Sequence, residues 1–358
     1  MDGQLGKNCG VHLQRESSAL VLVRADASSA IGSGHVMRCL ALAKACQDTG
    51  GTVSWVMAEG IPALEERLNR EGVACTRTQA VPGSSPDAEQ TISEARRANA
   101  AWVVVDGYRF TPDYVRTLKG SGLRVLFVDD DGRFEFYAAD VVLNQNVSAT
   151  PAMYANREPF TKLLLGLEYV LVRPEFLAES RRRELASVGR KVLVTMGGSD
   201  PENVTEKVLR ALATLDIDVK VVIGGGNPRR DTLPVMAERI SSKIQIEHNP
   251  ENMAPIMRWA DVAISAAGST CWELAYMGLP AIVTAISSDQ QGIAQGLAEQ
   301  GIALNLDWHA NLSEEAIREA LISLLHDHER RVQMSERGRK LIDGQGAARV
   351  VKFLQNSL

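Results

Sequence analysis

The sequence predicts an α/β protein in which two doubly wound, parallel-sheet domains face each other across a cleft. Strand-like and helix-like segments alternate along most of the 358-residue chain, a pattern typical of parallel sheets with crossover helices. The length suits two domains of about 150 residues each. A charged segment at 173–184 separates one alternating series from the next.

The first series is built from short apolar runs that end in polar residues. In the helix that begins at His35, the residues Val36, Leu40 and Ala43 form a stripe that packs on a sheet. Acidic residues such as Asp106 follow several strands, at the sheet edge where doubly wound folds bind ligands. We expect strands at 19–25, 52–58, 102–106, 124–129 and 140–144, and helices at 35–49, 62–71, 87–98 and 111–120.

The second series repeats this pattern and ends in a purely helical tail from Ser313. We expect strands at 191–196, 219–223, 244–247, 261–265 and 281–285, and helices at 201–215, 231–241, 252–259, 270–277 and 290–300. The predicted domains are a loose leader (1–18), a Rossmann-like domain (19–172), a second Rossmann-like domain (173–340), and a last helix (341–358) that packs back on the first domain.

Composition excludes several classes of protein. The chain is 45% hydrophobic and 23% charged, as soluble globular proteins are, and its net charge of −5 argues against a nucleic-acid surface. Its five scattered cysteines contain no C-x-x-C and indicate reduced thiols. The apolar runs are shorter than the roughly 18 residues that span a bilayer, and 1–18 lacks the apolar core of a secretory signal. We expect a cytoplasmic monomer that does not insert into membranes.

The loop after the first strand carries the clearest candidate for catalysis. Gly32 and Gly34 bring its backbone close to a ligand, and His35 lies in the first turn of the following helix. The positive end of the helix dipole favours a neutral imidazole, which is the form a general base requires. We expect Arg38, one turn later, to face an anion. A plain glycine turn is the alternative; a dinucleotide G-x-G-x-x-G motif fits less well, because Met37 replaces its third glycine.

Two small-residue loops in the second series are candidates for binding a diphosphate. Gly197, Gly198 and Ser199 follow a strand, and Ser199 or Asp200 is a plausible helix N-cap with Pro201 in the first turn. The second loop is Gly268-Ser269-Thr270. Small residues let backbone N–H groups approach phosphate, although ordinary strand-to-helix turns have the same composition.

Three further groups could contact a sugar nucleotide. Glu273, in a first helical turn, can accept from ribose hydroxyls or simply complement the helix dipole. Gln290 and Gln291 can bind a sugar or cap a helix, and Tyr108 follows the strand that ends at Asp106. The three acids at 129–131 are typical turn formers. The spacing of the acids predicts no metal site, and the scheme requires no cofactor.

Together these motifs resemble the PseG/SpsG family of UDP-sugar hydrolases, which are related to the MurG-type GT-B glycosyltransferases. The motifs that carry the resemblance are R-A-D-x-x-x-x-I-G-x-G-H-x-x-R (24–38), D-G-Y (106–108), V-D-D (128–130), V-L-N-Q (142–145), G-G-S-D-P (197–201), S-A-A-G-S-T-x-x-E (265–273) and D-Q-Q (289–291). The resemblance implies a GT-B-like fold.

The resemblance also implies an activity: hydrolysis of UDP-2,4-diacetamido-2,4,6-trideoxy-β-L-altropyranose to the free sugar and UDP, by anomeric C–O cleavage with inversion. That reaction belongs to the biosynthesis of pseudaminic acid, which is used in flagellin glycosylation and surface polysaccharides. By resemblance, His35 is the base for water, Tyr108 contacts the sugar, Glu273 binds the ribose, and Asn144 belongs to the substrate site. Gln290 departs from the asparagine of the family pattern, and its extra methylene displaces the amide that would contact the sugar.

Two other functions remain open at this stage. A GT-B glycosyltransferase would use the same site for a UDP-N-acetyl sugar and move the sugar to an acceptor hydroxyl. If its acceptor were a lipid, it would need an apolar patch with a basic rim, and no single segment of the first domain has that composition. A non-catalytic sensor of nucleotide sugars is the third reading.

Overall fold

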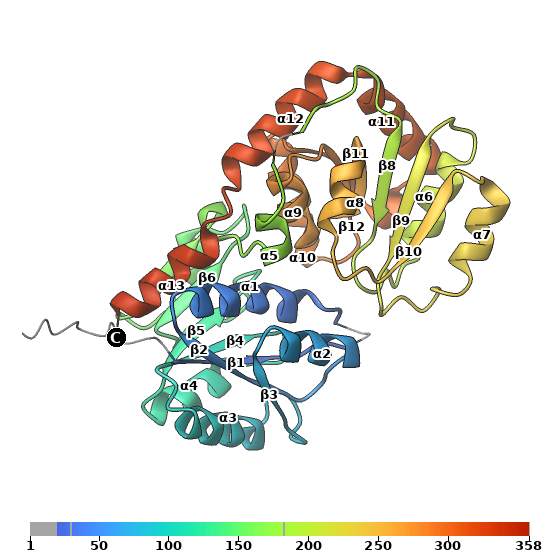
Figure 1. Cartoon of the computed structure of the whole chain (residues 1–358). Coiled ribbons are helices and arrows are strands. Elements are labelled where there is room, and N and C mark those ends of the chain that lie inside the picture. Colours follow the sequence, from blue (N-terminus) through green and yellow to red (C-terminus); the bar gives the residue numbers. More distant parts are fainter. Residues whose placement is uncertain (1–19, 29–30, 182, 358) are drawn as a thin grey trace, which may run out of the picture.

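The computed structural model describes residues 20–28, 31–181 and 183–357, and these form two parallel sheets covered by helices (Figure 1). The first sheet has seven strands in the order β3-β2-β1-β4-β5-β6-β7. The second has six strands in the order β10-β9-β8-β11-β12-β13. The predicted fold class, two α/β domains with parallel sheets, is confirmed.

The first sheet is flanked by helices of the N-terminal half and by one helix from the end of the chain. Its strands are β1 (Leu20–Ala25), β2 (Thr52–Met57), β3 (Ala74–Arg77), β4 (Trp102–Asp106), β5 (Arg124–Val128), β6 (Val141–Asn144) and β7 (Lys162–Leu165). Its helices are α1 (Gly34–Asp48), α2 (Pro62–Arg70), α3 (Ser85–Arg97) and α4 (Pro112–Gly120).

The second sheet follows the short helix α5 (Pro174–Leu177). Its strands are β8 (Lys191–Thr195), β9 (Asp218–Ile223), β10 (Ile244–His248), β11 (Val262–Ala266), β12 (Ala281–Ala285) and β13 (Ala303–Trp308). Its helices are α6 (Val204–Leu212), α7 (Leu233–Ile240), α8 (Ala254–Trp259), α9 (Thr270–Tyr276) and α10 (Asp289–Glu299), followed by α11 (Glu314–His326), α12 (His328–Leu341) and α13 (Gly346–Asn356). Across the described ranges, no helix is long and apolar enough to cross a membrane.

The strand order of each sheet reverses at one point. In the first sheet β1 pairs with both β2 and β4, and in the second β8 pairs with both β9 and β11. At such a point the crossover connections run to opposite sides, which leaves a crevice at the carboxyl ends of the two strands where ligands bind. The fold therefore offers one ligand crevice at the ends of β1 and β4 and another at the ends of β8 and β11.

The helix expected at 201–215 was placed too early. Asn203 and Asp200 have positive φ angles of 54° and 42°, so the helix begins only at Val204 and Pro201 lies outside it. The carboxylate of Asp200 accepts from the backbone N–H groups of Val204 and Thr205, at 2.9 and 3.0 Å. Asn203, rather than Ser199 or Asp200, therefore holds the N-cap position, and Asp200 accepts from the first-turn N–H groups from four residues before the helix.

The chain returns to the first sheet at its end. Helix α13 lies beside α1 (Figure 1), and Val350, Val351 and Leu354 share a buried core with Leu40. The indole N–H of Trp102 on β4 donates to the carbonyl of Leu354, at 3.2 Å. The last helix therefore packs both on α1, which begins next to the candidate site, and on the sheet.

Candidate active site

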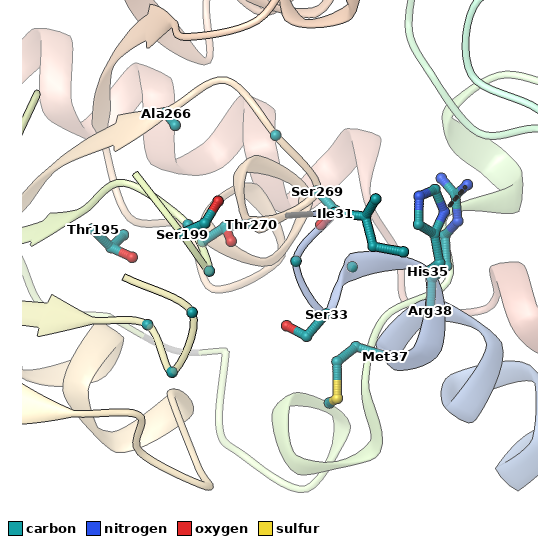
Figure 2. Close-up of a pocket in the computed structure, with 18 of the residues that line it drawn as sticks. Ile31, Ser33, His35, Met37, Arg38, Thr195, Ser199, Ala266, Ser269 and Thr270 are labelled. Atoms are coloured by element: carbon teal, nitrogen blue, oxygen red, sulfur yellow. Dashed lines mark hydrogen bonds between the residues drawn. The ribbon is translucent and has the colours of Figure 1, made fainter. Parts of the chain in front are cut away.

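One cleft of about 430 Å³ lies between the two sheets, lined by the loops after β1, β4, β8 and β11. Figure 2 shows His35 and Arg38 on one side of it and Ser199 and Thr270 on the other. Twelve of the predicted site residues line this cleft: Gly32, Gly34, His35, Arg38, Tyr108, Gly197, Gly198, Ser199, Gly268, Ser269, Thr270 and Gln290. The two crevices of the fold therefore open into one shared space.

The glycine loops of the two halves lie almost in contact. A Cβ placed on Gly198 would lie 3.5 Å from Cα of Gly32, and one placed on Gly34 would lie 3.7 Å from Oγ of Ser269. Gly32 and Gly197 also have positive φ angles, 75° and 78°, which other residues adopt at a cost. These glycines thus let backbone, rather than side chains, form the narrow part of the cleft.

His35 is oriented by a buried carboxylate. Its Nδ1 lies 2.7 Å from Oδ1 of Asp106, the last residue of β4, whose side chain is 0% exposed. Burial alone would raise the pKa of Asp106, but the charge of Arg38 and the hydrogen bonds from Arg38 and His35 hold it well below its usual range. An ionised carboxylate can only accept, so Nδ1 carries the proton. In the neutral ring, Nε2 then keeps its lone pair and can act as a base.

Arg38 has a different role from the one expected. Its guanidinium donates to both oxygens of Asp106, at 2.7 Å each, and to both oxygens of Asp130, at 2.7 and 2.9 Å. Burial alone would raise the pKa of Asp130 as well, and Arg38 lowers it. Arg38 therefore does not present a free cation to an anionic ligand. It pairs with the carboxylates of both Asp106 and Asp130 and fixes the one that holds His35.

The three acids at 129–131 do not act together. Asp129 accepts from the hydroxyls of Tyr137 and Tyr154, each at 2.9 Å, whereas Asp130 faces Arg38 and accepts from the side-chain amide of Asn146 at 3.2 Å. Within the described part of the chain, no group of three or more His, Cys, Asp or Glu side chains is arranged to hold a metal ion. Asp129 anchors the loop, and Asp130 belongs to the network around His35.

Tyr108 lies beside His35 and reaches the other half of the molecule. The two rings meet edge to face with centroids 4.8 Å apart, and the tyrosine hydroxyl lies 3.4 Å from Oδ2 of Asp289. Burial, together with Asp130 and Asp289, raises the pKa of Tyr108 well above its usual value. Its side chain therefore stays a neutral hydroxyl that can donate a hydrogen bond into the cleft.

Three predicted residues, Asn144, Gln291 and Glu273, do not line the cleft. Asn144 is fully buried: its amide donates to the hydroxyl of Tyr154 at 2.7 Å, and its carbonyl accepts from the backbone N–H of Asn146 at 2.9 Å. It supports the loop, while Gln145 and Asn146 line the cleft. Gln291 is exposed and does not line the cleft, unlike Gln290, whose carbonyl accepts from the backbone N–H of Ile286 at 3.2 Å.

Glu273 is separated from the cleft by an arginine. Its two carboxylate oxygens lie 2.5 and 2.8 Å from Nε and Nη2 of Arg173. Burial raises the pKa of Glu273, although the charge of Arg173 opposes this. Arg173 lines the cleft, whereas Glu273 does not. In this structure Glu273 therefore does not reach the cleft, and a ribose bound in the cleft would meet Arg173 instead.

Other cleft residues were missed in the sequence. They are Arg67 on α2, Arg173 before α5, Asn146 after β6, and Asp289 at the start of α10. Asp289 belongs to the D-Q-Q motif (289–291) but had no role assigned to it, and Asn146 directly follows the V-L-N-Q motif (142–145). No sequence signal separates Arg67 and Arg173 from ordinary surface arginines, because their partners lie far away along the chain.

The comparisons with known proteins agree with this geometry. Residues 191–349 match the glycosyltransferase family 28 C-terminal domain. The structure resembles MurG of Acinetobacter baumannii (TM-score 0.64, 17% identity, covering 94% of this chain and 99% of that one) and the spinosyn forosaminyltransferase SpnP (TM-score 0.64, 17% identity, 94% and 100%). The protein therefore has the GT-B fold, and the family 28 match is confined to its C-terminal half.

Two curated relatives are more specific. The spore coat polysaccharide biosynthesis protein SpsG of Bacillus subtilis is 28% identical over 235 residues, which are 65% of this chain and 69% of that protein. The UDP-2,4-diacetamido-2,4,6-trideoxy-beta-L-altropyranose hydrolase of Campylobacter jejuni is 26% identical over 190 residues, which are 52% of this chain and 62% of the hydrolase. The chain is thus similar to proteins of polysaccharide and sugar-nucleotide metabolism.

Proposed function

We propose that this protein hydrolyses UDP-2,4-diacetamido-2,4,6-trideoxy-β-L-altropyranose to UDP and the free sugar, as the name of the Campylobacter relative describes for that protein. The observation that carries the proposal is the 2.7 Å contact between His35 and Asp106, with the imidazole on the cleft wall opposite the loops of the second half. A carboxylate that fixes the tautomer of a histidine is the arrangement of a general base.

In this scheme the second half holds the UDP. The backbone N–H groups and small side chains of Gly197–Ser199 and Gly268–Thr270 bind the diphosphate, because no large side chain keeps it away from the backbone. Those donors stabilise the negative charge that accumulates on the departing diphosphate. Arg173, held by Glu273, replaces Glu273 as the residue that we assign to the ribose wall.

The first half activates the water. Nε2 of His35 takes a proton from water while the water oxygen forms a bond to the anomeric carbon. The bond from that carbon to the diphosphate oxygen breaks, and its electron pair leaves with UDP. Attack opposite the leaving group inverts the anomeric centre. Asp106 stabilises the imidazolium that forms, and the neutral hydroxyl of Tyr108 donates to the sugar.

Transfer of the sugar to an alcohol is the second candidate. It is favoured by the family 28 match of residues 191–349 and by the GT-B neighbours, several of which are named glycosyltransferases. His35 would then take its proton from the acceptor hydroxyl. The two reactions share the donor site and differ only in what occupies the space next to His35.

An isotope experiment separates the two candidates. The purified protein is incubated with a panel of UDP-diacetamido-trideoxyhexoses in ¹⁸O-water without any other acceptor, and the products are analysed by mass spectrometry. Hydrolysis predicts release of UDP with the label in the sugar. Label in the released nucleotide would place the cleavage at phosphorus and contradict the mechanism. Turnover only after an alcohol is added would identify a transferase.

A further inference from the structure

Helix α2 of the N-terminal half lines one part of the cleft. Ile61, Leu64, Arg67 and Arg70, at its start and along one side, line the cleft together with the loop 249–253 between β10 and α8. Figure 1 shows α2 beneath the ends of β9 and β10. The two walls in this part of the cleft therefore come from different halves of the molecule.

Two arginines of α2 fasten these walls to each other. Nη1 and Nη2 of Arg70 lie 3.1 and 3.0 Å from the two carboxylate oxygens of Glu251, a two-pronged ion pair between groups 181 residues apart. Nη1 of Arg67 donates to the backbone carbonyl of Glu251 at 3.2 Å. We call these contacts the Glu251 clasp. Because Glu251 belongs to the second sheet's loops, the clasp joins one half to the other directly over the cleft.

Arg67 also connects the clasp to the far wall through buried charges. Its Nη2 lies 2.9 Å from Glu175 on α5, and Glu175 lies 3.1 Å from Arg173, which in turn holds Glu273 on α9. These side chains are at most 15% exposed. Removing one member of a buried series of charges leaves its partner uncompensated, so the position of α2 is tied to the wall that carries Arg173.

The geometry of the cleft indicates what this part encloses. If the anomeric carbon lies at His35 and the diphosphate at the glycine loops, the part of the cleft lined by α2 and the loop 249–253 is free to take the nucleoside. Each half contributes apolar side chains to the lining, Ile61 and Leu64 from the first and Val222 and Met253 from the second, beside the charged groups of the clasp. A planar base with apolar faces and a polar edge suits a slot of this composition.

We propose that α2 forms the second wall of a nucleoside pocket, and that the Glu251 clasp holds this wall closed over a bound nucleoside diphosphate. The inference relies on the proposed UDP site, but not on whether water or an alcohol receives the sugar. An enclosed nucleoside loses more water-exposed apolar surface than one bound to the second half alone. Opening the clasp should therefore weaken nucleotide binding.

Arg70 is the best residue for the test, because its side chain is 55% exposed and that of Glu251 is 74% exposed. Reversing such a charge does not disturb the core. Arg70→Glu should raise the Kd of UDP about 2- to 5-fold, a range set by the small energies of exposed ion pairs. The double variant Arg70→Glu/Glu251→Arg restores the pair in the opposite sense and should recover most of the affinity. Titration calorimetry measures all three proteins.

Inorganic pyrophosphate is the second probe, since it carries the diphosphate without a nucleoside. Its affinity should be the same in the wild type and in Arg70→Glu. Arg97→Glu is the matched control: Arg97 on α3 is exposed, pairs with Glu94, and does not line the cleft, so its UDP affinity should equal that of the wild type. Equal UDP affinity in Arg70→Glu, an equal loss for pyrophosphate, or no recovery in the double variant would overturn the inference.

The failure of this inference can be told apart from failure of the proposed function. If the wild type binds UDP and releases labelled sugar but Arg70→Glu binds UDP equally well, only the nucleoside wall is wrong. If UDP binding depends on the clasp but sugar is released only to an alcohol, the wall stands and the hydrolase proposal is wrong. Absence of UDP binding in the wild type would overturn both.

Discussion

His35 and Asp106 are 71 residues apart in the chain, yet Nδ1 of the histidine lies 2.7 Å from Oδ1 of the aspartate. The contact exists because β1 and β4 are neighbours in the sheet, so that the loop after one and the last residue of the other meet at the same edge. Arg38, one turn after His35, grips the same carboxylate. The following predictions test whether this group performs the chemistry.

Replacing His35 with alanine should lower turnover by about two to four orders of magnitude, the usual contribution of a general base. The Kd of UDP should stay nearly the same, since the proposed diphosphate donors belong to the other half. His326→Ala, at an exposed position on α11 outside the cleft, should keep the wild-type rate. Near-normal turnover in His35→Ala would rule out its role as the base.

Asp106→Asn should lower turnover roughly 10² to 10⁴-fold without changing UDP affinity. The amide has one acceptor where His35 and Arg38 both donate, so the imidazole loses its fixed tautomer, as in the corresponding change in a Ser-His-Asp triad. Steady-state kinetics and UDP titration on the folded variant measure this split. A joint loss of affinity and turnover would instead indicate collapse of the cleft.

Acid should remove part of the stability that Asp106 provides. Its pKa is below the usual value in the folded protein and about 3.9 in the unfolded chain. The contribution is therefore complete above about pH 4 and is lost as the pH falls from there toward the folded value. In urea unfolding, the difference in free energy of unfolding between the wild type and Asp106→Asn should be smaller at pH 3 than at pH 7. A constant difference between the two proteins would contradict the ion-pair account.

Adjacent glutamines give a matched pair of variants. Gln290 lines the cleft and Gln291 does not, so Gln290→Ala should lower kcat/KM about 10-fold, the effect of losing one to two kcal/mol of hydrogen bonding. Gln291→Ala should stay within about twofold, as surface changes usually do. Equal losses in both variants would show that both glutamines contact the substrate, as the family resemblance implies, and would contradict the geometry of the cleft.

Asn144 should prove structural. Asn144→Ala leaves the buried backbone N–H of Asn146 without its acceptor and removes the amide that donates to Tyr154. We expect a loss of about 1–3 kcal/mol in the free energy of unfolding, measured by urea denaturation. KM for the substrate should change little in protein that remains folded. A large rise in KM at unchanged stability would return Asn144 to the substrate site.

The sequence identified the central strands of both sheets but missed three others, β3, β7 and β13. All three are outermost strands of their sheets. An edge strand has one neighbour and is partly open to water, so it needs no continuous apolar run: β3 reads Ala-Cys-Thr-Arg and β13 contains Asn305 and Asp307. This reason does not apply to β7, which reads Lys-Leu-Leu-Leu. Their pairing is determined by the neighbouring strand rather than by their own composition.

The parts of the site that are formed by backbone could be predicted from the sequence. The parts that depend on pairing between distant side chains were predicted less well. The glycine loops follow directly from strand-to-helix turns, and twelve predicted residues meet in one cleft. Arg38 and Glu273 were misassigned because their partners, Asp130 and Arg173, lie 92 and 100 residues away. Asn144 was misassigned because its side chain, at the end of β6, accepts from the backbone N–H of Asn146 and stabilises the loop. Asn146 is the residue that lines the cleft.

The packing of α13 on α1 has a consequence for biosynthesis. A ribosome makes the N-terminal sheet long before residues 346–356 emerge, yet Val350, Val351 and Leu354 complete the core beneath the helix that begins beside His35. During translation that core has an open apolar side that only the final segment can cover. The N-terminal half therefore stays incompletely packed, and prone to aggregation, until residues 346–356 have been synthesised.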